Sequence, residues 1–108
     1  MLSTPSIFEV LNFLRVRPTL YLADATISNL WSFVLGFAMA QRYNDSSSSL
    51  ANTATSELRP YHDWVAAKLG FRESTAGWRN MILERAGDNE TEAFQLFFRL
   101  LDEYQACH

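Results

Sequence analysis

The sequence predicts an all-α protein that forms a single compact domain of about five helices. Five segments carry apolar residues at the spacing of a helix, and none carries the strict alternation of a half-buried strand. The chain also lacks the Asn-Gly and Asp-Gly dipeptides that mark β-hairpins. Its 108 residues suit one domain. We therefore expect residues 1–108 to fold as one helical unit.

The first helix is expected to begin at Ser6. The pattern Ser6-x-x-Glu9 is that of a capping box, in which both side chains satisfy free N–H groups of the first turn. Apolar residues follow at helical spacing, and Pro18 ends the helix because the residue before a proline disfavours the α conformation. Residues 17–22 are then expected to be extended or irregular.

The second helix is expected to run from Thr26 or Ser28 to about Tyr43. Its apolar residues form one broad face: Ile27, Leu30, Trp31, Val34, Phe37 and Ala38. Phe33, Leu35 and Met39 widen this face, which predicts a central and largely buried helix. The polar stretch from Asn44 to Ser56, with four consecutive serines, predicts a flexible surface loop within the one domain.

The last three helices are separated by glycines and capping residues. The third is expected to start around Pro60 and to end before Gly70, which can adopt a positive φ. Ser74 is a plausible cap for the fourth helix, which Gly87 ends. The pattern Asn89-x-x-Glu92 predicts the start of the fifth, whose apolar stripe is Phe94, Phe97, Leu101 and Tyr104.

Composition and charge exclude several classes of function. Twelve acids against nine bases give a formal charge of −3, unlike the basic surface of a nucleic-acid binder. The longest strongly apolar stretch, residues 30–40, is about half the ~20 residues that span a bilayer. The N-terminal residues do not resemble a secretory signal. We therefore expect a cytoplasmic protein that binds neither nucleic acid nor membrane.

Catalytic and metal-binding groups are sparse. His62 and Asp63 are adjacent, so on a helix their side chains diverge. Cys107 and His108 stand at the end of the sequence, where nucleophilic catalysis would lack a fixed geometry. Two histidines and one cysteine are too few for a typical metal site, and no glycine-rich phosphate loop is present. We expect neither an enzyme nor a cofactor.

One alternative is a small enzyme or ligand carrier. In that case Trp64, Trp78 and His62 would line a pocket, and Glu73 would converge on His62. A solid core without a pocket would argue against it.

Residues 71–78 allow two interpretations. They could form a recognition loop that presents Trp78 and Arg79, residue types common in interface hot spots. The favoured interpretation is a connection between helices, in which Trp78 fills the core.

Negative charge gathers near the C-terminus. Residues 84–103 hold six acids and two bases, a net charge of −4, whereas the remaining residues sum to +1. Acids at a helix N-terminus have a simple electrostatic explanation. They could also dock a basic protein partner. The candidate partner-binding residues are Glu84, Asp88, Glu90, Glu92, Asp102 and Glu103, with Asp45 of the serine-rich loop as a further candidate.

Several segments together resemble a family of small bacterial proteins. These segments are RPTLYL at 17–22, WSFVLGF at 31–37, HDWV at 62–65, KLGF at 68–71, STAGWRNMIL at 74–83 and FFRLLDE at 97–103. The similarity covers most of the chain outside the serine-rich loop. The present sequence has Thr19 and Ala23 where the family pattern has glycines, so the turn after Pro18 is expected to differ.

The family in turn looks like the immunity proteins of bacterial toxin systems, including contact-dependent growth inhibition. The resemblance implies a protein that binds its cognate toxin domain, often a nuclease, and blocks the toxin's active site. The alternative is a small helical adaptor or regulatory protein with no connection to a toxin.

Overall fold

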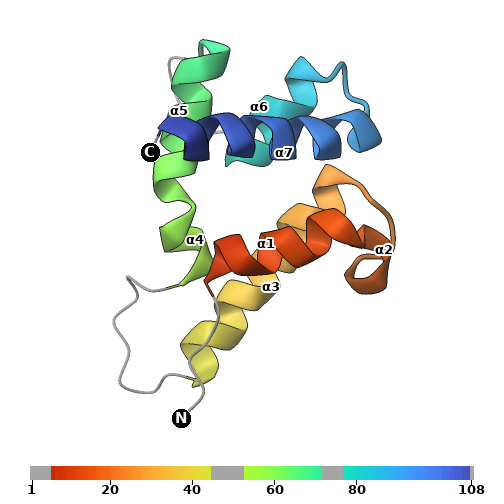
Figure 1. Ribbon diagram of the computed structural model, residues 1–108, viewed down its shortest axis with the longest axis vertical. Helices are drawn as coiled ribbons and strands as arrows, with labels where there is room; N and C mark the ends of the chain where they lie inside the picture. The colour runs from red at the N-terminus through yellow and green to blue at the C-terminus, as the bar shows by residue number, and fades with distance from the viewer. Residues whose placement is uncertain (1–5, 45–52, 72–76, 108) are drawn as a thin grey trace.

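The computed structural model describes residues 6–44, 53–71 and 77–107, and this part of the chain is helical without strands (Figure 1). It contains seven helices: α1 (Ile7–Val16), α2 (Pro18–Tyr21), α3 (Ile27–Asn44), α4 (Ala54–Glu57), α5 (Arg59–Leu69), α6 (Gly77–Arg85) and α7 (Glu90–Cys107). The five longer helices are those that the sequence predicts. The radius of gyration, 13.9 Å, is close to the ~13 Å of a compact domain of this size.

Helix α3 connects the two halves of the molecule. It contacts α4, α6 and α7, while α5 packs against both α6 and α7. Figure 1 shows α5, α6 and α7 grouped at one end, with α1, α3 and α4 at the other. Residues from all the described helices except α2 thus share one hydrophobic core.

Local sequence signals set the helix ends as expected. The Ser6 hydroxyl accepts a hydrogen bond from the Glu9 backbone N–H at 3.4 Å, which caps α1. The Asn89 side chain accepts one from the Glu92 N–H at 3.0 Å at the start of α7. Gly70 ends α5 with a φ of 80°. The proposed cap Ser74 lies outside the described residues.

Two short helices correct the sequence prediction. Residues 18–21 form helix α2 and not the expected irregular segment, because Pro18 stands at the first helical position, where its fixed φ suits a helix; Leu22, just after it, is extended as expected. The predicted loop 44–56 also ends earlier than expected. Thr53 caps α4, and the Ala54 N–H donates to the Gln41 side chain at 2.6 Å. This contact with α3 is a tertiary one, which the local sequence could not reveal.

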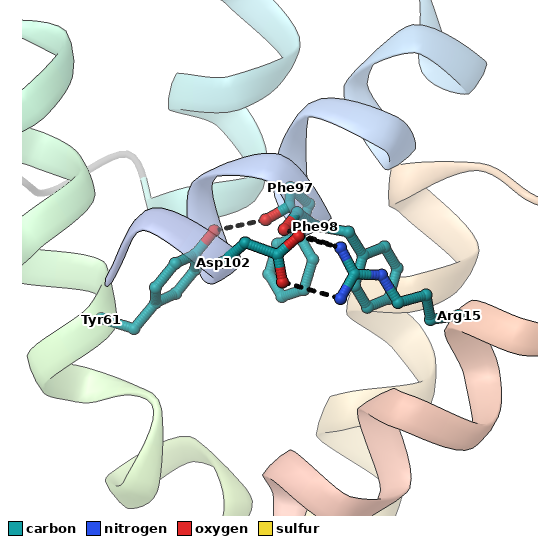
Figure 2. Close-up of polar contacts among 5 residues, drawn as sticks. All are labelled: Arg15, Tyr61, Phe97, Phe98 and Asp102. Atoms are coloured by element: carbon teal, nitrogen blue, oxygen red, sulfur yellow. Dashed lines mark hydrogen bonds and ion pairs between the residues drawn. The ribbon is translucent and has the colours of Figure 1, made fainter. Parts of the chain in front are cut away.

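The core is dense with aromatic rings around Tyr61 and Phe97. Both side chains are fully buried, and their ring centroids lie 5.2 Å apart in an edge-to-face arrangement. The Tyr61 hydroxyl donates a hydrogen bond to the Phe97 carbonyl at 2.9 Å (Figure 2). Burial raises the pKa of Tyr61 well above its usual value. The hydroxyl therefore stays neutral and satisfied in the core.

The prediction that the second helix is largely buried is wrong for one of its faces. Ile27, Leu30, Val34 and Ala38 of α3 are buried, but Leu35, Met39 and Tyr43 are 43, 66 and 87% exposed. The apolar face of α3 is wider than the surface that its neighbouring helices cover. The uncovered apolar side chains form part of the candidate site.

Candidate functional site

Three of the seven predicted acidic residues are engaged within the protein itself. Glu90, Asp102 and Glu103 each contact a partner side chain on another helix. Glu84, Asp88 and Glu92 are exposed, and their side chains form no hydrogen bond or ion pair within the part of the chain that the structure describes. Asp45 lies outside the described residues. The structure thus separates three interhelical acids from three that remain available at the surface.

Glu90 fixes the start of α3. Its carboxylate accepts hydrogen bonds from the Ser28 backbone N–H at 2.9 Å and from the Ser28 hydroxyl at 2.7 Å. Arg79 of α6 donates to the same hydroxyl oxygen through Nε and Nη2 at 3.0 and 2.9 Å. The bond from the Ser28 hydroxyl is the main cause of the lowered pKa of Glu90. Glu90 therefore links the first turns of α3 and α7.

Asp102 ties α7 to α1. The Arg15 guanidinium donates to both carboxylate oxygens of Asp102, with 2.7 Å between Nη1 and Oδ1 (Figure 2). It also donates to the Phe98 carbonyl at 3.3 Å and lies 5.3 Å from the centre of the Phe98 ring. The hydrogen bond lowers the pKa of Asp102 and raises that of Arg15. Glu103 makes a similar link to α5 through Lys68 at 2.9 Å.

Among the described residues, the large apolar side chains that are exposed form two groups. One lies on α1 and α2: Phe13, Val16, Leu20 and Tyr21. The other, which we call the α3 track, consists of Leu35, Met39 and Tyr43. The members of the α3 track recur every four residues and therefore share one side of the helix.

A pocket of about 430 Å³ lies at one end of the α3 track, between α3, α4, α5 and α6. Its volume falls in the ~300–1,000 Å³ range of ligand sites. Apolar side chains make up much of its wall: Trp31, Val34, Leu35, Leu58 and Trp78. Gly77 and the polar residues Thr55, Arg59, His62 and Asp63 complete it. Leu35 belongs to both features, so the pocket and the α3 track form one continuous surface.

Trp78 lies where the sequence analysis places it, whereas Trp64 does not line the pocket. Trp78 is buried and lines the pocket together with Trp31, and their ring centroids lie 4.9 Å apart. Its burial agrees with the helix connection rather than with a loop that presents Trp78 to a partner. Trp64, which the alternative placed in the pocket, packs instead against Tyr61 and Tyr104. Glu73 lies outside the described residues.

Other kinds of site find no support in the described part of the chain. No group of three or more His, Cys, Asp or Glu side chains there is arranged to hold a metal ion. None of the described helices is long and apolar enough to cross a membrane.

Comparisons with known proteins give no indication of the function. No family model, no curated protein and no solved structure matches the chain. The α3 track was missed in the sequence, although the great width of the apolar face of α3 was a visible signal of it. Of the pocket residues, Trp78 and His62 were named from the sequence, as one alternative, but not Trp31, Arg59 or Asp63.

Proposed function

We propose that the protein binds another protein, and that this partner is a bacterial toxin domain whose active site it occludes. The observation that carries the binding function is the α3 track, which leaves Leu35, Met39 and Tyr43 exposed beside a pocket. Contiguous exposed apolar surface on a small protein is typical of an interaction site. No catalytic step is part of the proposal.

The choice of a toxin rests on the resemblance of the segments at 17–22, 31–37 and 62–83 to a family like the immunity proteins. Charge supports a nuclease toxin in particular. Glu84, Asp88 and Glu92 are exposed acids without a described partner. A nuclease carries a basic surface for its nucleic acid, and an acidic inhibitor would be steered toward that surface.

Co-expression tests the proposal directly. The genes beside this one would be searched for a large secreted protein, its C-terminal domain would be produced with and without the present protein, and growth and complex formation would be measured. Rescue of growth together with a purified one-to-one complex is expected. A toxin domain that still kills, and that forms no complex with the purified protein, would contradict the proposal.

Matched charge reversals test the acidic contribution. Glu84→Lys with Glu92→Lys is expected to slow association by about tenfold or more at low salt, because steering by opposite charges raises association rates. Asp88 is left unchanged because its φ of 64° is poorly tolerated by most side chains. The control, Glu9→Lys with Asp24→Lys, makes the same change of charge at two other exposed acids. Equal rates for both variants would exclude the acidic surface as the docking face.

A further inference from the structure

The rim of the pocket carries polar side chains that the fold does not use. Arg59, His62 and Asp63 line it, and their side chains make no hydrogen bond or ion pair with any other described residue. Arg59 and Asp63 are one helical turn apart on α5, a spacing that permits an ion pair. The rim therefore offers a donor, an acceptor and an imidazole to a bound group.

The floor of the pocket is aromatic and aliphatic. Trp31 and Trp78 meet edge-to-face at 66°, with Val34 and Leu58 beside them. Gly77 has a φ of 78°, and a Cβ atom there would lie 3.2 Å from the Trp31 ring. Glycine thus permits both the backbone turn and the close approach of Trp31. The floor suits a ring, because aromatic pairs favour offset or edge-to-face contacts.

We propose that this pocket binds an aromatic side chain of the partner polypeptide together with the peptide group that carries it. The inference rests on the proposed function and specifies the partner's chemistry at that surface. A peptide unit has one N–H donor and one C=O acceptor. Asp63 accepts from the N–H, Arg59 donates to the C=O, and the ring packs on Trp31 and Trp78.

The rest of the partner segment lies along the α3 track. From Trp31 to Tyr43 the helix extends about 18 Å at 1.5 Å per residue. Leu35, Met39 and Tyr43 mark this path at four-residue intervals. The flexible Met39 side chain adapts to varied apolar surfaces. The partner segment is therefore anchored in the pocket by its ring and continues along α3 by apolar contacts.

A small probe tests the pocket without the toxin. N-acetyl-phenylalaninamide carries the ring and two peptide groups and would be titrated against ¹⁵N-labelled protein. The indole N–H signals of Trp31 and Trp78 are expected to shift and saturate. Trp64 is the internal control, because it packs on Tyr61 and Tyr104 outside the pocket. Unchanged signals, or equal shifts of all three, would overturn the inference.

Two matched substitutions extend the test. Leu35→Arg places a long charged side chain at the edge of the pocket, whereas Leu20→Arg makes the same change at an exposed leucine of α2. Leu35→Arg is expected to weaken probe binding by about tenfold, as loss of an anchor contact does. Leu20→Arg should leave it unchanged. Thermal unfolding followed by circular dichroism verifies that both variants are folded.

The same variants separate failure of this inference from failure of the proposed function. If the wild-type protein binds the toxin and Leu35→Arg binds it equally well, the pocket is not the anchor although the function stands. If the wild-type protein binds the probe but not the toxin, the proposed function is contradicted. The proposal that the pocket receives a side chain of that polypeptide partner is then contradicted as well. Support requires that Leu35→Arg weaken both complexes while Leu20→Arg weakens neither.

Discussion

Helices α3 and α7 have the same length, 18 residues, but use their apolar side chains differently. In α7, all of whose residues are described, no large apolar side chain is exposed, and α1, α5 and α6 all contact it through side chains. In α3 one side is buried and another carries the α3 track. An apolar residue thus stabilises the fold only where a neighbouring helix covers it, and elsewhere it is available for binding.

Removal of a buried ring from α7 should cause a greater loss of stability than any other substitution considered below. Phe97→Ala in α7 should lower the free energy of unfolding by about 3–5 kcal/mol, since it removes a fully buried ring that contacts Tyr61 and Trp78. Phe13→Ala, at an exposed ring of α1, is the matched control and should change it by less than about 0.5 kcal/mol. Urea unfolding measures both, and similar losses would break the contrast between covered and uncovered rings.

A moderate loss of stability is expected from a substitution at Gly77, where the start of α6 packs against Trp31 of α3. Gly77→Ala should cost about 1–2 kcal/mol, because an L residue is strained at a φ of 78° and its Cβ would press on Trp31. Gly36→Ala is the control, since a Cβ there meets nothing within 4 Å. It should stabilise α3 by about 0.5–1 kcal/mol, the usual gain from replacing a helical glycine. Thermal melts of both variants would show opposite shifts, and a destabilised Gly36→Ala would contradict this description of α3.

A smaller effect concerns the ion pair that holds α7 to α1. The pKa of Asp102 is lowered in the fold, so its contribution to stability is present above the unfolded pKa, near 4, and is lost as the pH falls through the folded pKa. Because the pair is largely exposed, it is worth at most about 1 kcal/mol. Asp102→Asn should be slightly less stable at pH 7 and should lose less stability between pH 5 and 2, by urea unfolding. An identical pH dependence would show that the pair contributes nothing.

The smallest expected effect tests the uncovered side. Met39→Lys should change the free energy of unfolding by less than about 0.5 kcal/mol, because the side chain is mostly exposed and lysine is a good helix former. The same change should weaken the complex with the partner. A loss of stability comparable to that of Phe97→Ala would mean that Met39 is buried in the folded protein.

The helices and their caps were predictable because their causes are local. Ser6, Asn89 and Gly70 act on backbone groups within a few residues, so a single sequence reveals them. Helix α4 was missed although Thr53 caps it locally, because its four residues are too few to show an apolar period and one of its N–H groups is satisfied by Gln41 of α3. The acidic candidates were found because they cluster in the sequence. Clustering could not show that Asp102 forms an ion pair with Arg15 within the fold, whereas Glu92 forms none with a described residue.

The all-α class, the five long helices and the excess of acids near the C-terminus can all be recognised in the amino-acid sequence alone. Periodicity and capping depend on residues close in the chain, which accounts for this success. The packing of the helices is needed to explain why Leu35, Met39 and Tyr43 remain exposed, and why Trp31 and Trp78 share a pocket with Arg59, His62 and Asp63. Exposure depends on which helices lie against a given face, and that is set by contacts between residues distant in the sequence.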